Sequence, residues 1–262
     1  MKKAFRIFRI ILLFICAAVF IVSSVMLVNI LIEYGKADSF YDSINENIDT
    51  SKVEAEGEQA PARLVALAEY VSELKAEYPD VVGYVNVPSL GIAYPVVQTD
   101  NNDYYLTHMI NGEESKSGAI FLDYRVNSDP TQTKNTVLYG HNMNDGSMFH
   151  KIEEFFSSRE LFEGAVVEYV TENGAYRYTP LAIYRCEAYY PFHMYEFRND
   201  EAFLEFCDMI SEKSFHLTDT EYNEGSSIIT FATCVNSITT KNARYIYQAV
   251  LTDAYSFKEA LE

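Results

Sequence analysis

Apolar residues form one unbroken block near the start of the chain. Residues 10–32 are 23 positions without a charged side chain, and four basic residues precede them: Lys2, Lys3, Arg6 and Arg9. A helix of about 20 apolar residues crosses the hydrocarbon core of a bilayer, and basic flanks stay in the cytoplasm. A cleaved signal peptide has a shorter apolar region and a small-residue cleavage site. The pattern therefore favours a cytoplasmic basic tail at 1–9 and a retained transmembrane anchor at 10–32.

The polarity of the chain changes twice after this block. Residues 33–61 are polar and acidic, which predicts a linker between the membrane and an extracellular domain at 62–262. From Ala62 onward, apolar residues recur at helical spacing and predict an amphipathic helix that Pro79 helps to end. These residues are Leu64, Leu67, Ala68, Val71, Leu74 and Tyr78.

Short β-rich segments make up most of the remaining chain. Eight runs, many of them alternating apolar and polar positions, lie at 83–87, 92–98, 118–124, 136–139, 165–171, 176–189, 227–233 and 244–251. The series predicts a mostly β fold, built as a closed or nearly closed mixed β-barrel. Two helical interruptions are predicted, at 147–156 and 200–213. The second lies in a long connection between two strands, 190–226, and long connections are usually functional.

Composition and charge limit the classes of function. The chain has 262 residues, 48% of them hydrophobic, which is enough for one sizeable core beside the anchor. Its formal net charge is −18, and four of its basic residues lie in the short N-terminal tail, so the exported part is more acidic still. Such a surface repels phosphate backbones. We therefore expect no nucleic-acid partner.

A thiol at the end of an apolar strand is the strongest chemical signal. The run Ser227-Ser-Ile-Ile-Thr-Phe-Ala-Thr-Cys234 ends on a cysteine, and Arg244 follows ten residues later. His141 likewise follows an apolar strand through a glycine, which places its imidazole where the chain opens into a loop. The thiolate is the attacking form of cysteine, and a nearby base or cation favours it. Together the three residues suggest a cysteine transpeptidase.

Other chemistries find less support. The exported part has three cysteines, an odd number, so at least one cannot form an internal disulfide. Spacings typical of zinc and calcium sites are absent, as are a glycine-rich phosphate loop and the Gly-x-Ser-x-Gly motif. The sequence therefore predicts neither a metal nor a cofactor.

Several motifs together resemble the sortase family, and most of all its class B members. The strand end Thr230-Phe-Ala-Thr-Cys234 is similar to the sortase Thr-Leu-x-Thr-Cys motif, with Phe231 in place of leucine. The resemblance covers about residues 62–252, and the helix-bearing connection at 190–226 is a further class B trait. Three more segments resemble class B sequences: Tyr139-Gly-His-Asn-Met143, Gly118-Ala-Ile-Phe-Leu-Asp-Tyr-Arg125 and Asn102-Asp-Tyr-Tyr-Leu106.

The resemblance implies an eight-stranded sortase barrel and a membrane-anchored enzyme that cleaves a C-terminal sorting signal of secreted proteins after threonine. Cys234 would form a thioacyl enzyme, and an amine of a peptidoglycan precursor would take over the acyl group. His141 would act as acid and base, and Arg244 would hold the carbonyl oxygen or the peptide. The residues expected to line the substrate groove are Asn102, Leu106, Ala232, Thr233 and Asn236.

Two other classes of function stay open at this point. The chain could be a membrane-anchored binding or adhesion module, in which Cys234 is an inert thiol and His141 a turn residue. It could also be an extracellular cysteine protease that only hydrolyses peptides. Reactivity of Cys234 separates the first alternative from the enzyme, and transfer to an amine separates the second.

Overall fold

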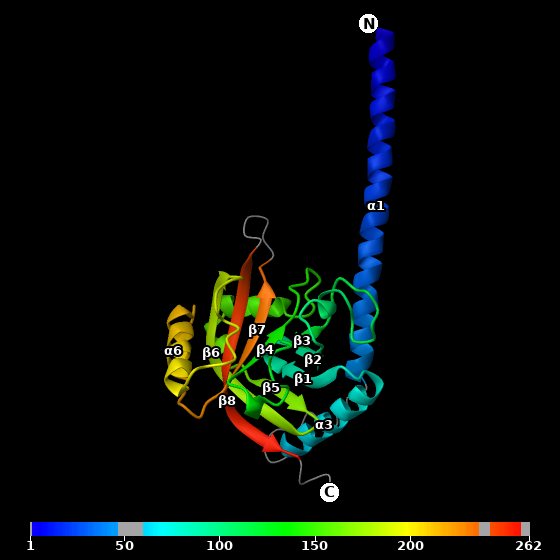
Figure 1. Ribbon diagram of the computed structural model, residues 1–262. Coiled ribbons are helices and arrows are strands. Elements are labelled where there is room, and N and C mark those ends of the chain that lie inside the picture. Colours follow the sequence, from blue (N-terminus) through cyan, green and yellow to red (C-terminus); the bar gives the residue numbers. More distant parts are fainter. Residues whose placement is uncertain (1, 47–59, 236–241, 258–262) are drawn as a thin grey trace.

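Eight strands close into one barrel in the computed structural model, which describes residues 2–46, 60–235 and 242–257 (Figure 1). The strand order around the barrel is β1-β2-β3-β4-β7-β8-β6-β5, and the β2–β3 and β4–β7 pairs are parallel. The eight predicted strands and the mixed, closed barrel are thus confirmed. Their bounds are β1 Val81–Val87, β2 Ile92–Val97, β3 Ile120–Leu122, β4 Asn135–Tyr139, β5 Val167–Thr171, β6 Gly174–Glu187, β7 Ile228–Cys234 and β8 Ala243–Ser256.

Large aromatic side chains fill the barrel. Tyr169, Phe231 and Tyr247 are fully buried, and the Phe231 ring contacts the rings of both Phe149 and Tyr247. Burying a side chain of this size contributes about 1.5–3 kcal/mol. Strand β7 is buried at every position except its last, Cys234, which is partly exposed. The core therefore buries every residue of β7 except Cys234, which stays partly accessible to solvent at the end of the strand.

Helix α1 (Lys2–Glu46) is longer than the predicted anchor. Its apolar first part contains the one stretch of the described residues that is long and apolar enough to cross a membrane. Its last part packs on the barrel, where Ala37, Tyr41 and Ile44 are buried. The Tyr41 hydroxyl donates a hydrogen bond to the Gly118 carbonyl at 2.9 Å. The limits predicted for the linker are therefore corrected, because residues 33–46 are helical and docked.

Spacing explains this correction. Positions 37, 41 and 44 lie four and three residues apart, so they share one helix face despite their acidic and polar neighbours. Asn45 extends the docked face: its Nδ2 donates to the Ala93 carbonyl at 3.1 Å, and its Oδ1 accepts from the Tyr84 hydroxyl at 2.6 Å. Residues 47–59 of the predicted linker lie outside the described residues, and α3 begins at Ala60.

Two further helices cover the barrel from outside. Helix α3 (Ala60–Glu77) packs on β1, β5 and β6, close to the predicted span. Helix α6 (Asp200–Lys213) has the predicted bounds; the Asn199 side chain caps it by accepting from the Ala202 amide, and its apolar face packs on β6.

The first predicted helical interruption, at 147–156, begins later than expected. It consists of η5 (His150–Glu153) and α4 (Glu154–Ser157), and the remaining short helices are α5 (Arg159–Glu163), η2 (Pro88–Leu90), η3 (Tyr104–Leu106) and η4 (Pro130–Gln132).

Candidate active site

Cys234 and Arg244 come from neighbouring antiparallel strands. They form the last residue pair of the β7–β8 ladder, at the end of β7 and near the start of β8. On the other side of β8, Arg244 pairs with Cys186 of β6. The guanidinium donates from Nη1 to the Ala243 carbonyl at 3.1 Å. The ladder therefore places a residue with a permanent positive charge next to the residue that carries the strand-end thiol.

His141 reaches the same end of the barrel because β4 and β7 are parallel. Their ladder runs to the pair Tyr139–Ala232, and the Gly140 amide then donates to the Ala232 carbonyl at 3.3 Å. A Cβ on Gly140 would lie only 2.8 Å from the Phe149 ring, so the close packing of this turn requires glycine. Parallel strands carry their C-terminal residues to one edge of a sheet, which is why His141 and Cys234 lie at the same end of the barrel.

A hydrogen bond fixes the tautomer of the His141 ring. Its Nε2 lies 2.7 Å from the Leu106 carbonyl oxygen, which can only accept, so Nε2 carries a proton. Nδ1 is then the ring nitrogen left to exchange a proton with a bound molecule. Leu106 ends the short helix η3, and its side chain is partly exposed.

One cleft of about 300 Å³ contains all three candidate catalytic residues. Four of the five predicted groove residues also line it: Asn102, Leu106, Ala232 and Thr233. The fifth, Asn236, lies outside the described residues. The Thr233 hydroxyl is buried and has no hydrogen-bond partner in the described part of the chain. The remaining lining residues are Phe121, Arg125, Tyr139, Gly140, Ala188, Phe192 and His193.

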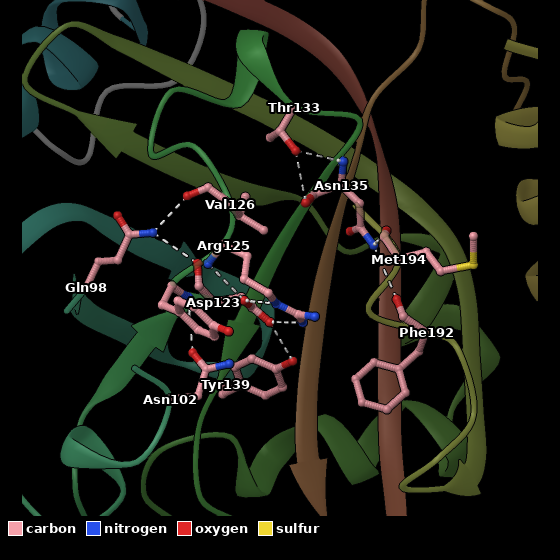
Figure 2. A network of polar contacts seen from close by, with 11 residues as sticks. Gln98, Asn102, Asp123, Arg125, Val126, Thr133, Asn135, Tyr139, Phe192 and Met194 are labelled. Carbon is pink, nitrogen blue, oxygen red and sulfur yellow. Dashed lines mark hydrogen bonds and ion pairs between the residues drawn. The ribbon is translucent and has the colours of Figure 1, made fainter. Parts of the chain in front are cut away.

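A buried carboxylate organises one wall of this cleft (Figure 2). The fully buried Asp123 side chain accepts three hydrogen bonds from Arg125, at 3.1 Å from its amide, 2.8 Å from Nε and 2.6 Å from Nη2, and one from the Tyr139 hydroxyl at 3.0 Å. Burial acts to raise the pKa of Asp123, but the bonds and charge of Arg125 outweigh it, and the pKa lies below its ordinary value. Arg125 also stacks on the Tyr195 ring. The wall is therefore rigid and carries a fixed cation.

Asn102 and His193 lie beside this wall. The Asn102 Oδ1 accepts from the Tyr124 amide at 3.0 Å, which ties the segment before η3 to the end of β3 (Figure 2). Burial, with the nearby charge of Arg125, lowers the pKa of His193, while Asp123 acts in the opposite direction. His193 therefore favours the neutral ring, and the charge that it adds to the cleft at neutral pH is small.

The other thiols outside α1 lie in different surroundings. Cys186 and Cys207 are both buried and free, and burial raises the pKa of Cys186 to about 11 and that of Cys207 to about 12. Neither forms a disulfide. Cys234 is the partly exposed thiol of the three, which singles it out as the candidate nucleophile.

Sequence reasoning missed the roles of Arg125, Tyr139 and the insertion residues Phe192 and His193. The spacing Asp123-Tyr-Arg125 at the end of a buried strand was a usable signal, because a buried carboxylate needs a partner. Tyr139 was visible only as a neighbour of the glycine before His141. Phe192 and His193 lie in the long connection, which has no periodic pattern that would place them beside β4 and β7.

The fold and this cleft define a β-barrel thiol enzyme, and comparison with known proteins identifies its family. A sequence model described as the sortase domain matches residues 85–252, well over half of the chain, so the chain belongs to the sortase family. The family implies transpeptidase activity at the cell wall. A Listeria monocytogenes protein named sortase B is 30% identical over 172 residues, covering 66% of this chain and 70% of the relative.

Solved structures agree with this assignment. A Bacillus anthracis sortase B in complex with AAEK1 is 29% identical and has a TM-score of 0.71, covering 86% of this chain and all of that one. A Staphylococcus aureus sortase B–substrate complex has a TM-score of 0.73 over 85% of this chain and 99% of that one. At 22% identity, the latter supports the fold alone. The predicted sortase barrel is confirmed.

Proposed function

We propose that this chain is a membrane-anchored class B sortase that cuts a C-terminal sorting signal after threonine and transfers the acyl part to a peptidoglycan amine. One observation carries the proposal: Cys234, His141 and Arg244 line a single cleft. The class rests on the relatives named sortase B and on the helix-bearing connection that contains α6.

The chemistry follows from the three side chains. The Cys234 thiolate attacks the threonine carbonyl, and a C–S bond forms as the carbonyl becomes a tetrahedral oxyanion. The C–N bond then breaks, and the departing amine takes a proton from Nδ1 of the protonated His141 ring. Arg244 offers fixed donors to the oxyanion or to the peptide backbone. The product of this half-reaction is a thioester on Cys234 and a neutral His141.

The second half-reaction reverses these roles. The acceptor amine attacks the thioester carbonyl, His141 takes up the proton that the amine loses, and the C–S bond breaks to release the Cys234 thiolate. Atoms and charge balance without a cofactor. Asn102, Leu106, Ala232 and Thr233 hold the sorting peptide, and the Thr233 hydroxyl, which has no partner among the described residues, supplies a donor or acceptor to it. Asn236 joins them on the family resemblance alone.

The anchor sets where this reaction takes place. The apolar part of α1 spans the membrane with its basic N-terminal end in the cytoplasm, and the barrel lies on the extracellular face. The end of β7 that carries Cys234 faces the side of the barrel toward which α1 runs to its N-terminus (Figure 1). The proposed anchor keeps the cleft near the membrane, where a secreted protein still held by its C-terminal signal is within reach.

A peptide library tests the proposal. The full chain in a non-ionic detergent is incubated with candidate sorting peptides, with and without triglycine or a diaminopimelate-type peptide, and the products are identified by mass spectrometry. We expect cleavage after threonine, ligation to the added amine, and no product from the Cys234→Ala variant. Hydrolysis alone would support the protease, and product from Cys234→Ala would refute the proposed nucleophile.

A further inference from the structure

The backbone on either side of the nucleophile is held in different ways. On the β8 side, Cys234 is a ladder residue paired with Arg244. On the β4 side, the ladder ends two residues earlier, at Tyr139–Ala232. Here the carbonyl oxygen of Cys234 accepts a hydrogen bond from a side chain, Nδ2 of Asn142, at 2.9 Å. A buried amide from the residue next to His141 thus takes the place of the missing strand partner.

A second histidine sets the orientation of this amide. The Asn142 Oδ1 lies 2.6 Å from Nδ1 of His150. Because Asn142 donates through its nitrogen to a carbonyl, its oxygen has to accept, so His150 donates from Nδ1. The other ring nitrogen, Nε2, lies 3.4 Å from a carboxylate oxygen of Glu153. A directed pair of hydrogen bonds therefore runs from His150 through Asn142 to the backbone of Cys234, with the Glu153 carboxylate near the far side of the His150 ring.

The loop between the two histidines is closed and tightly packed. The Phe149 amide donates to the His141 carbonyl at 3.0 Å, and the Phe149 ring stacks on Phe231 of β7 at 4.8 Å. Met148 has φ 56°, a left-handed conformation that a non-glycine residue adopts at a cost of about 1–3 kcal/mol. Its amide donates to the Tyr94 hydroxyl at 3.0 Å. The surrounding contacts hold this strained turn, which is typical of a loop whose geometry matters for function.

From these contacts we infer that Asn142, oriented by His150, is a positioning residue that sets the distance between the His141 ring and the Cys234 thiol. This inference rests on the proposed roles of Cys234 and His141. Asn142 does not touch the reacting atoms. It joins the loop that begins with the general acid to the strand that ends with the nucleophile, so a change in its bonding moves one relative to the other.

Replacement of the donor tests the first link. Asn142→Asp keeps the size of the side chain but puts a second acceptor against the Cys234 carbonyl. We expect kcat for a soluble sorting peptide to fall about 10- to 100-fold, with KM within about twofold because the groove itself is unchanged. Asn45→Asp is the matched control, since Asn45 also accepts from a side chain and donates to a carbonyl, but far along the chain at the docked end of α1. It is expected to lower the melting temperature and leave kcat unchanged.

Replacement of His150 tests the hydrogen bond between His150 and Asn142. It also keeps the inference testable if the Asn142→Asp variant fails to fold. His150→Leu removes the donor and is expected to lower kcat about tenfold, whereas His150→Asn keeps an N–H near the position of Nδ1 and is expected to restore most of it. If His150 acts only through Asn142, adding His150→Leu to Asn142→Ala lowers kcat no further. Additive losses, or full kcat in folded Asn142→Asp, would overturn the inference. Since Cys234→Ala tests the nucleophile separately, either result leaves the proposed function standing.

Discussion

Cys234 and Arg244 are joined as the terminal pair of the β7–β8 ladder, and both line the cleft that also contains His141. The ladder fixes the backbone positions of the two residues, so both side chains start from the same end of the barrel. Strand β7 is buried at every position before Cys234, and β8 is buried from Ile246 to Val250, so the core holds the backbone of both strands close to the two side chains.

Arg244→Lys tests the need for a planar fork of donors at this position. Lysine keeps the charge but loses the fixed geometry, so we expect kcat/KM for a sorting peptide to fall about 100- to 1,000-fold, as when one oxyanion donor is lost. Steady-state kinetics with the full chain measure this. The exposed Arg185 of β6 is a suitable control, and Arg185→Lys is expected to retain full activity. A fully active Arg244→Lys enzyme would remove Arg244 from the mechanism.

Thiol exposure gives a second prediction. In the full chain carrying Cys16→Ser, iodoacetamide at pH 8 is expected to modify Cys234 and spare Cys186 and Cys207. With pKa values of about 11 and 12, only about one in a thousand Cys186 thiols and one in ten thousand Cys207 thiols is ionised at that pH. Peptide mapping by mass spectrometry measures the modification, and in urea all three should react. A native Cys234 that resists the reagent would favour the binding module.

Much of the fold was predictable because each signal was local. Strand β7 is an apolar run with its thiol at the end, and the bounds of α6 follow from its Asn199 cap and apolar face. Residues 33–46 were misjudged because acidic and polar side chains there hide a short apolar stripe. This stripe is recognisable as a packing surface only once the barrel is seen to lie against it, and the sequence pattern does not reveal that tertiary contact.

The docked end of α1 gives a third prediction. Tyr41→Ala removes a buried ring and its bond to Gly118, so we expect the free energy of unfolding to fall by about 3–5 kcal/mol. Tyr41→Phe removes only the hydroxyl and should cost about 1 kcal/mol. Urea denaturation of the full chain in detergent measures both. Tyr189→Ala, at a side chain that is 85% exposed, is the control and should change stability by less than about 0.5 kcal/mol. Equal stability of Tyr41→Ala and the parent would mean that the docked segment contributes nothing.

The three candidate catalytic residues could be predicted from the sequence, whereas several other residues that line the cleft could not. Cys234, His141 and Arg244 each stand at or next to a strand end, and parallel pairing of β4 and β7 brings the strand ends together. Arg125 was harder to identify, since its role depends on the burial of Asp123. Phe192 and His193 reach the cleft through the path of the long connection, and no sequence periodicity determines that path.

Asp123 gives the last prediction, a dependence of stability on pH. The pKa of its carboxyl in the folded chain lies below the ordinary value of 3.8, because the bonds and charge of Arg125 outweigh the effect of burial. A carboxyl whose pKa is lower in the folded chain than in the unfolded chain stabilises the folded state. This contribution is complete above about pH 4 and is lost as the pH falls through the folded-state pKa. Asn at this position cannot ionise and so lacks the contribution.

Asp123→Asn is therefore expected to lower the free energy of unfolding by about 1–3 kcal/mol at pH 7, and the difference from the parent should shrink below pH 4. Urea denaturation of the full chain at pH 7, 5 and 3 in a non-ionic detergent measures the two curves. Asp219→Asn, at an exposed carboxylate, controls for the loss of one negative charge. Its free energy of unfolding should change with pH in the same way as that of the parent. A difference that stays constant from pH 7 to pH 3 would show that the ionised Asp123–Arg125 pair does not stabilise the wall of the cleft.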